Sequence, residues 1–159
     1  MNIRLATSND IEAINALYAY LNPGDPRVTT PQSIQAAIDA THVYFIVMED
    51  FDIETPDTSH IVGTGCLNEI VQPSQIQRKG FLDDFVLHPV VRGKGYGEKL
   101  YFALEQEARR RGYRLLNYTV GQGEKRAAMR RLHSKMGHLI RAHATLGDET
   151  NYYEHNLTK

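Results

Sequence analysis

The chain has one cysteine, no tryptophan and no apolar run near the roughly 20 residues needed to cross a bilayer. Because Cys66 is the single cysteine, no disulfide can form within the chain, which is typical of a reducing compartment such as the cytoplasm. The first residues also lack the basic segment followed by an apolar one that marks a secretory signal. These absences predict a soluble cytoplasmic protein that neither spans nor binds a membrane.

The chain is 159 residues long, 42% of them hydrophobic, and it shows no internal repeat or break in composition. This length matches one domain of roughly 100–200 residues and is enough to bury a core without disulfides or metal. We therefore predict a single domain over residues 1–159.

Charge is divided unevenly along the chain. Residues 1–91 contain 4 Lys or Arg and 12 Asp or Glu, whereas residues 92–159 contain 14 and 7. A polyanionic ligand would lie against the second half and a cationic one against the first, although two solvated faces explain the counts equally well. The basic residues have no aromatic platform for stacking bases beside them, so nucleic acid is not an expected partner.

Apolar periodicity predicts an α+β order of elements. Strands are expected at 3–6, 42–48, 61–71, 80–87 and 114–120, with two closing strands around 139–140 and 152–153. Helices are expected at 11–21, from about 31 to 38, at 96–111 and at 125–136. The 96–111 helix is the clearest, since Leu100, Leu104 and Ala108 recur every four residues on one face.

The most informative stretch runs from Phe85 to Gly97, where an apolar strand leads through a glycine-rich turn into that helix. Alternate glycines let the backbone curl tightly and approach a ligand closely. A helix start offers unpaired N–H groups and a partial positive charge, which favour a phosphate or diphosphate. The turn itself is Arg92, Gly93, Lys94, Gly95, Tyr96 and Gly97.

Two other phosphate-binding loops fit this turn poorly. A Walker A loop needs Ser or Thr after its lysine, and here Gly95 follows Lys94. A dinucleotide fingerprint has the spacing G-x-G-x-x-G in the first strand–helix unit, whereas this turn has G-x-G-x-G after several strands. A nucleotide-binding module therefore remains only a third reading.

The turn resembles the R/Q-x-x-G-x-G/A signature of the GNAT family of N-acetyltransferases, and the order of elements is similar over nearly the whole chain. The resemblance implies a central, mostly antiparallel twisted sheet, splayed at the coenzyme A site and flanked by about four helices. It implies acetyl-CoA as the acyl donor, held by the backbone amides from Arg92 to Gly97. It also implies that the pantetheine and acetyl group lie against Phe85, Val86 and Leu87.

Amine acylation by direct attack in a ternary complex needs a base for the amine. Asp83 and Asp84 are the candidates, because they lie on the strand that leads to the signature, where some relatives carry an acidic pair. Successive strand residues point to opposite faces, so we expect one of them to reach the cleft. Asp84 shares a face with Val86 and is favoured, although a strand bulge would reverse the choice. The alternative is one paired and one solvated carboxylate.

The acid that protonates the thiolate is less defined. His133 occupies the position of the tyrosine that donates this proton in the family's last helix, and His138 stands where the family has phenylalanine. His133 either replaces the tyrosine or is a surface histidine, with solvent finishing the reaction. Alternative hydroxyl groups belong to Tyr118, Tyr152 and Tyr153.

Further interpretations concern the remaining polar groups. Cys66 is expected to pack in the core, and the spacing of His133, His138 and His143 does not suit a metal site. The expected acceptor is a small primary amine, drawn to the acids of the two flanking loops, and a protein amine is less favoured. A longer acyl donor and a non-catalytic acetyl-CoA sensor are the alternatives, and a homodimer is one assembly that the sequence allows. The loop acids are Asp25, Asp50, Asp52, Glu54 and Asp57.

Overall fold

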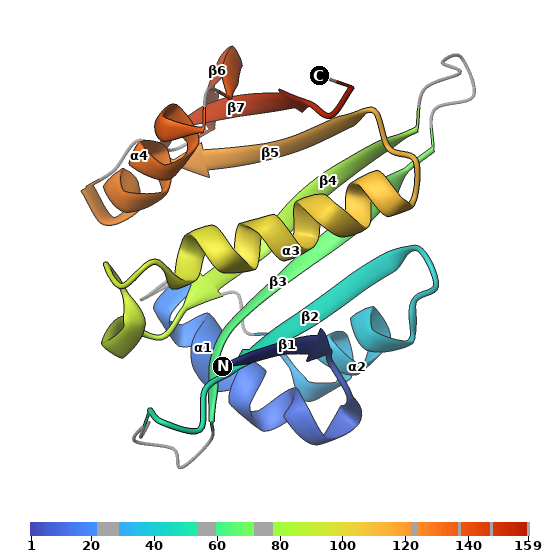
Figure 1. Ribbon diagram of the computed structural model, residues 1–159, viewed down its shortest axis with the longest axis vertical. Helices are drawn as coiled ribbons and strands as arrows, with labels where there is room; N and C mark the ends of the chain where they lie inside the picture. The colour runs from blue at the N-terminus through green and yellow to red at the C-terminus, as the bar shows by residue number, and fades with distance from the viewer. Residues whose placement is uncertain are drawn as a thin grey trace.

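A computed structural model describes residues 1–21, 29–53, 60–71, 78–121, 124–136, 138–146 and 148–158, and for 125, 139–146, 148 and 149 it describes the backbone alone. These residues form a seven-stranded sheet in the order β1-β2-β3-β4-β5-β7-β6 (Figure 1). Adjacent strands are antiparallel except β4 and β5, which are parallel. The strands are β1 (Asn2–Leu5), β2 (Val43–Glu49), β3 (Ile61–Ile70), β4 (Lys79–Leu87), β5 (Leu115–Gly121), β6 (Leu139–Leu146) and β7 (Asp148–Asn156).

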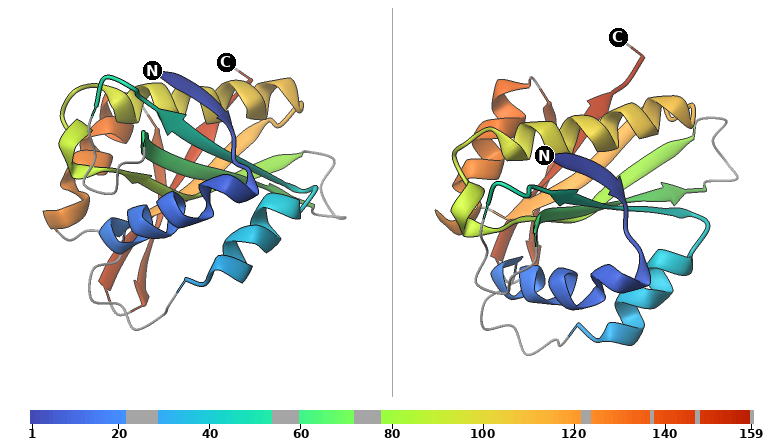
Figure 2. Two further views of the ribbon diagram at one scale, coloured as in Figure 1. Left: turned by 90° about the horizontal axis from the view of Figure 1, so that it is seen from below. Right: turned by 60° about the horizontal axis from the view of Figure 1, so that its bottom comes forward.

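The helices lie on both faces of the sheet, with α1 and α2 on one side and α3 on the other (Figure 2). The predicted α+β architecture with four flanking α-helices is confirmed, with small shifts at element ends; the expected helix from 125, for instance, begins with a short 3-10 turn. The helical segments are η1 (Ser8–Asp10), α1 (Ile11–Leu21), α2 (Pro31–Asp39), η2 (Pro89–Val91), α3 (Tyr96–Arg110), η3 (Glu124–Arg126) and α4 (Ala127–Lys135).

The larger hydrophobic core lies between α3 and the sheet. The spacing seen in the sequence places Leu100, Leu104 and Ala108 on the buried face of α3, where they pack with Leu116 and Tyr118 of β5. Burying a leucine side chain stabilises the fold by roughly 1.5–3 kcal/mol, so this face contributes strongly to holding α3 on the sheet. Its N-terminus is thereby positioned at one end of β4 and β5.

A second core lies on the opposite face, where Ile14 and Leu17 of α1 and Ile34 of α2 pack with residues of β2, β3 and β4. Cys66 of β3 belongs to it and is 3% exposed. Burial, followed by the charges of Asp84 and Asp83, raises the pKa of the Cys66 thiol, so the group is an uncharged core side chain at neutral pH.

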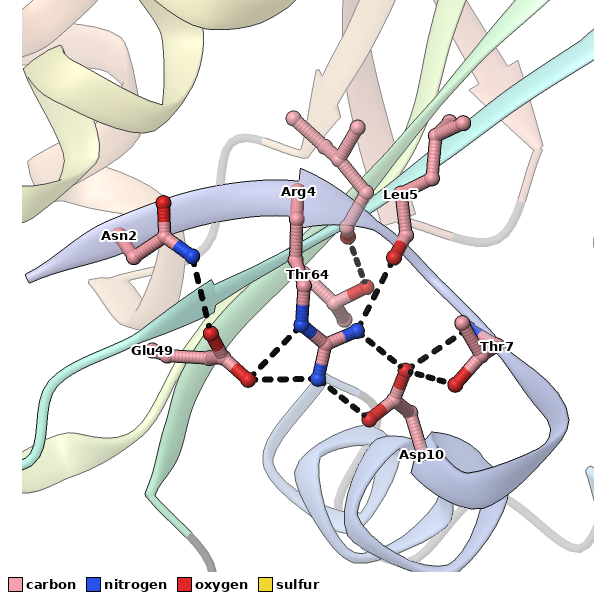
Figure 3. Close-up of polar contacts among 8 residues, drawn as sticks. Asn2, Arg4, Leu5, Thr7, Asp10, Glu49 and Thr64 are labelled. Atoms are coloured by element: carbon pink, nitrogen blue, oxygen red, sulfur yellow. Dashed lines mark hydrogen bonds and ion pairs between the residues drawn. The ribbon is translucent and has the colours of Figure 1, made fainter.

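The edge strand β1 is tied down by a network of ion pairs around Arg4 (Figure 3). Its guanidinium donates to both carboxylate oxygens of Asp10, at 2.7 and 2.8 Å, and to Glu49 Oε1 at 2.5 Å. Burial acts to raise the pKa of Asp10, but hydrogen bonds from Arg4 and Thr7 outweigh it and lower that pKa. Arg4 therefore joins β1, η1 and β2 in one unit.

The sheet opens between β4 and β5. Within the described residues these strands pair only from Lys79 to Phe81 on β4 and from Leu115 to Asn117 on β5. Beyond Phe81 and Asn117 the strands separate toward the end where α3 begins (Figure 1). The predicted splay is thus present, and we call this opening the fork.

Candidate active site

The glycine-rich turn lies at the open end of the fork. Gly93 and Gly95 have φ angles of 78° and 83°, a left-handed conformation that side chains with a Cβ rarely adopt. Two amides of the turn are used inside it, since Arg92 N–H donates to Pro89 O at 3.1 Å and Lys94 N–H to Val91 O at 3.3 Å. Of the amides from Arg92 to Gly97 that are predicted to hold the diphosphate, these two therefore already have a main-chain partner.

The remaining amides of the turn form an anion-binding arrangement. Among the described residues, the N–H groups of Gly93, Gly95, Tyr96 and Gly97 make no hydrogen bond to another main-chain group. A Cβ atom added at Gly93 or Gly95 would meet no atom within 4 Å, so the space in front of them is open. With the positive end of the α3 dipole behind them, these amides fit a diphosphate group.

Two arginines add positive charge beside the turn. Arg92 Nε donates to Leu87 O at 3.1 Å, and its guanidinium lies 6.0 Å from the centre of the Tyr20 ring. Burial, and then the charge of Arg92, lowers the pKa of Arg126, which also donates to Leu21 O at 2.5 Å. Arg126, from the 3-10 turn before α4, thus lies close enough to the signature for its charge to interact with that of Arg92.

A bond that the sequence did not predict fixes the start of α3. The Tyr96 hydroxyl donates to Asp50 Oδ2 at 2.5 Å, and Asp50 is 4% exposed. This hydrogen bond, followed by burial, raises the pKa of Tyr96. Asp50, expected to be a solvated loop acid or an attractor of amines, instead connects the end of β2 to the signature turn. Asp25, Glu54 and Asp57 lie outside the described residues.

The three strand residues expected along the acyl donor line the β4 arm of the fork. Phe85 and Leu87 pack against the α3 core, whereas Val86 belongs to the α1 and α2 core. Val86 and Leu87 pair with Thr64 and Gly63 of β3, and beyond Phe81 no described β5 residue pairs with β4. Their main chain therefore has one edge open to the fork.

A bulge interrupts β4 at the two aspartates. The β3 partners Thr64 and Cys66 are two residues apart, but their β4 partners Val86 and Asp83 are three apart. Asp84 is the extra residue and has a φ of 49°, and its N–H donates to Asp83 Oδ1 at 3.0 Å. Simple strand alternation therefore fails at this point.

The bulge places both carboxylates on the α1 side of the sheet. Asp83 lies opposite Cys66, which belongs to the core under α1, and the Tyr18 hydroxyl of α1 donates to Asp84 Oδ2 at 3.2 Å. The expectation that only one carboxylate faces a given side is therefore wrong. Asp83 is exposed and Asp84 is half-buried, so the two carboxylates differ in solvation.

Burial, and then the charge of Asp83, raises the pKa of Asp84, although the Tyr18 hydrogen bond lowers it in part. A carboxylate with a raised pKa binds a proton more strongly, which makes it a better base near neutral pH. A non-glycine residue at positive φ costs free energy, and such strain concentrates at functional sites. The bulge does not reverse the choice between the two carboxylates, because it turns both toward α1; the positive φ and the raised pKa then favour Asp84 over Asp83 as the candidate base.

His133 lies in a buried cluster of rings on the β5 side of the fork. It is fully buried, so the surface-histidine alternative is wrong. Its ring centre is 4.1 Å from that of Tyr118, and its Nδ1 is 3.1 Å from His138 Nδ1. The cluster, called here the ring cluster, consists of Tyr101, Tyr118, His133, His138, Tyr153 and His155.

Hydrogen bonds run through the ring cluster. The Tyr118 hydroxyl contacts His138 Nδ1, and the Tyr101 hydroxyl lies 2.9 Å from His155 Nδ1. Burial, and then the charges of other histidines, lowers the pKa of His133 to about 3 and that of His138 to about 4. Both rings are therefore uncharged at neutral pH, and His133 does not hold the extra proton that an acid would give.

A cavity in the described structure lies away from the fork. It has a volume of about 870 Å³ and lies between α3 and the strands β1 and β2, with Ile3, Tyr44 and Phe102 in its lining. It meets the glycine turn only at Gly95 and contains no residue of the fork arms. We therefore place the active site at the fork rather than in this cavity.

The sequence itself matches a known family. The sequence model of the Acetyltransferase (GNAT) family matches residues 11–138, which are most of the chain. The chain belongs to the GNAT acetyltransferase family. No curated protein matches the sequence.

GNAT structures from several bacteria share the fold. The protein yncA from Salmonella typhimurium, described as an acetyltransferase with its cofactor acetyl-CoA, is 22% identical with a TM-score of 0.79, covering 100% of this chain and 95% of its own. An N-acetyltransferase from Staphylococcus aureus is 21% identical with a TM-score of 0.82, covering 99% and 98%. A ribosomal-protein-alanine N-acetyltransferase from Brucella melitensis is 19% identical with a TM-score of 0.78, covering 98% and 99%. At these identities the likeness shows the fold and not the acceptor.

Two kinds of feature are absent from the described residues of this GNAT protein. The described side chains contain no group of three or more His, Cys, Asp or Glu arranged to hold a metal ion. Among the described helices, none combines the length and apolar character required to traverse a bilayer.

Proposed function

We propose that this GNAT protein transfers the acetyl group of acetyl-CoA to a primary amine of a small molecule by direct attack in a ternary complex. The observation that carries the proposal is the set of open amides at Gly93, Gly95, Tyr96 and Gly97, in the turn that follows the β4 arm of the fork. Acetyl-CoA supplies an activated thioester when bound. Its diphosphate would lie on these amides, with Arg92 and Lys94 adding positive charge.

The pantetheine arm would then follow the fork along the open edge of β4. Main-chain groups between Phe85 and Leu87 would hydrogen-bond its amides, as a missing β5 strand would otherwise do. Phe85 and Leu87 supply apolar walls and exclude water from the thioester. This course brings the acetyl group close to the bulge that contains Asp84.

Asp84 is proposed as the base that removes the proton of the amine, directly or through one water, with Asp83 beside it. The attacking nitrogen forms a bond to the thioester carbon as the C–S bond breaks, and its extra proton passes to the Asp84 carboxylate. The pair of carboxylates also attracts a cationic amine before deprotonation. We propose that water, rather than His133, protonates the departing thiolate, because the His133 ring is uncharged at neutral pH.

A second candidate is a sensor that binds acetyl-CoA without turnover. It is supported by position 133, where the family's tyrosine is replaced by a fully buried histidine with a pKa of about 3. A protein amine remains an alternative acceptor, and the Brucella melitensis structure shows that the same fold serves an enzyme named for a protein substrate. The single cysteine is consistent with our proposal of a cytoplasmic protein.

The test is thiol release from acetyl-CoA across a panel of small amines and short peptides, with coenzyme A affinity measured in parallel by calorimetry. We expect amine-dependent thiol release that is faster with small amines than with peptides. Tight binding of acetyl-CoA without release by any amine would support the sensor. Tighter binding of ATP or NAD than of coenzyme A would remove the assignment altogether.

A further inference from the structure

Asn117 is a buried polar residue for which neither the fold nor the donor site accounts. It is 2% exposed, and its side-chain Nδ2 makes no hydrogen bond among the described residues. A buried amide group without a partner costs free energy, so native proteins rarely retain one without a use. Its position makes that use recognisable.

Asn117 stands at the closed end of the fork. It pairs with Phe81 of β4, and this is the last pair before the two strands separate. The next residues, Leu82 on β4 and Tyr118 on β5, do not pair with each other across the fork. The amide of Asn117 is therefore at the base of the opening in which the acyl donor and acceptor would meet.

Strand alternation decides on which face of the sheet the Asn117 side chain lies. Its neighbours Leu116 and Tyr118 both belong to the core under α3. Side chains alternate along a strand, so Asn117 faces the opposite side, toward α1. Asp83 and Asp84 lie on that same side, where Tyr18 of α1 contacts Asp84.

We propose that Asn117 recognises the acceptor, donating a hydrogen bond to an oxygen of the acceptor while Asp84 and Asp83 receive its amine. This inference rests on the proposed acetyl transfer and narrows its acceptor. Two residues along a strand span roughly 7 Å, which separates Asp83 from the level of Asn117. A molecule of amino-acid size, with a carbonyl or carboxylate oxygen a few bonds from its primary amine, bridges that distance.

The pairing of roles follows from the chemistry of the two arms. The β4 carboxylates accept hydrogen bonds and attract a cation, whereas the Asn117 amide donates to a neutral or anionic oxygen. An amine without such an oxygen would leave the amide unpaired in the complex. A site built to bond an oxygen discriminates strongly against an analogue that lacks it.

The experiment compares alaninamide with sec-butylamine, which keeps the amine and the branched carbon but lacks the carbonyl group. Binding of each to the protein saturated with coenzyme A is measured by calorimetry, which does not require turnover. We expect the unaltered protein to bind alaninamide about tenfold tighter, which corresponds to one hydrogen bond of about 1.4 kcal/mol. Equal affinities would overturn the proposal.

Asn117→Leu removes the amide at nearly constant volume. The variant should bind both amines equally, keep its coenzyme A affinity and melt at the same or a higher temperature, because an unpaired buried group is gone. Asn117→Asp, which retains the shape and loses the donor, should likewise lose the preference if the leucine variant fails to fold. A retained preference, or a loss of coenzyme A affinity in place of alaninamide affinity, would contradict the assignment.

Tyr113→Phe is the matched control. The Tyr113 hydroxyl is also buried and makes no hydrogen bond among the described residues. Tyr113, however, lies just before β5 and against Gly80, beyond the closed end of the fork. Its removal should leave the preference for alaninamide unchanged. Thiol release in the amine panel is a separate readout, so a failure of acetyl transfer is distinguishable from a failure of Asn117 to bind the acceptor.

Discussion

The two arms of the fork carry opposite kinds of titratable groups. On β4, Asp84 is half-buried and Asp83 exposed, and the pKa of Asp84 is raised. On the β5 side, His133 and His138 are buried among tyrosine rings, and their pKa values are lowered to about 3 and about 4. Burial disfavours the charged form in both cases, which raises the pKa of an acid and lowers that of a base.

The same physical cause therefore has opposite chemical consequences. A partly desolvated carboxylate binds a proton more strongly and becomes a stronger base. A fully desolvated histidine stays neutral and loses its value as an acid. In our proposal the β4 arm therefore supplies the proton chemistry, whereas the β5 arm supplies shape and, at Asn117, a neutral hydrogen bond.

The largest effect is expected from a substitution that tests whether acetyl-CoA binds at the turn following the β4 arm. Gly95→Val would place a side chain in the amide cradle and strain a residue with a φ of 83°. Losing two charge-assisted hydrogen bonds should weaken coenzyme A binding by about 1,000-fold, as measured by calorimetry.

Gly112→Val is the control for Gly95→Val, because Gly112 has a φ of 75° at the far end of α3 and equally open surroundings. It should lower stability by a similar amount without changing coenzyme A affinity. Equal affinities in the two valine variants would place the diphosphate elsewhere.

Asp84→Asn sharpens the contrast by removing the charge from the β4 arm. Turnover should fall about 100-fold, the lower range for loss of a general base. Asparagine tolerates positive φ, so the bulge is retained. The pKa of Asp84 is raised in the fold, so the protein loses stability when the pH rises above that pKa and the buried carboxyl ionises. At pH 8 the uncharged variant should therefore unfold at a higher urea concentration than the parent.

Asp83→Asn serves as the comparison for the Asp84 variant, since it removes the exposed carboxylate of the same pair. It should reduce turnover by much less. A larger loss in Asp83→Asn than in Asp84→Asn would reverse the assignment of the base.

The β5 arm should show the opposite dependence of stability on pH. His133 and His138 bind fewer protons in the fold than in the unfolded chain, so stability falls as the pH drops from about 6.5 toward their folded values. At pH 5 the cost is on the order of 2 kcal/mol for each ring. The free energy of unfolding, measured with urea, should fall between pH 7 and pH 5 by about 2 kcal/mol less in His133→Phe than in the parent.

Turnover of His133→Phe decides whether the ring takes part in chemistry. If water protonates the thiolate, turnover at pH 7 should remain within about threefold of the parent, which is far less than loss of a general acid would cause. A much larger decrease with normal coenzyme A affinity would restore His133 as the donor. An unchanged stability difference between pH 7 and pH 5 would contradict its burial as a neutral ring.

The smallest effect concerns the bond between α1 and the bulge. The Tyr18 hydroxyl stabilises the charged form of Asp84, so Tyr18→Phe should raise the pKa of Asp84 further. The acidic limb of the profile of kcat/KM against pH should move upward by roughly half a unit. Tyr44→Phe, a change on β2 away from the fork, should not move that limb, and a downward shift for Tyr18→Phe would refute the contact.

Local sequence patterns were sufficient for the main elements and for the position of the glycine-rich turn. The four-residue spacing of Leu100, Leu104 and Ala108 predicted α3, and the alternate glycines before Tyr96 predicted an anion site at its start. These features depend on backbone conformation over a few residues. The splay, and the part of the chain that borders it, followed from the resemblance to the GNAT family rather than from periodicity.

Contacts between distant segments could not be predicted in this way. Alternation placed Asp83 and Asp84 on opposite faces, but the pairing of β3 with β4 inserts a bulge and turns both toward α1. A helical motif could not show that position 133 faces three tyrosines from α3, β5 and β7. Asp50 looked like a loop acid until the fold brought Tyr96 to it from 46 residues away.

The sequence alone determined the main helices and strands and the presence of a glycine-rich turn at the start of α3, because these depend on short-range sterics and periodicity. Tertiary structure decided which polar groups are charged and which face the fork, because solvation and partners are properties of the packed molecule. Asn117 illustrates the division: nothing nearby in the chain marks it, and its unpaired amide exists only once two strands meet and part.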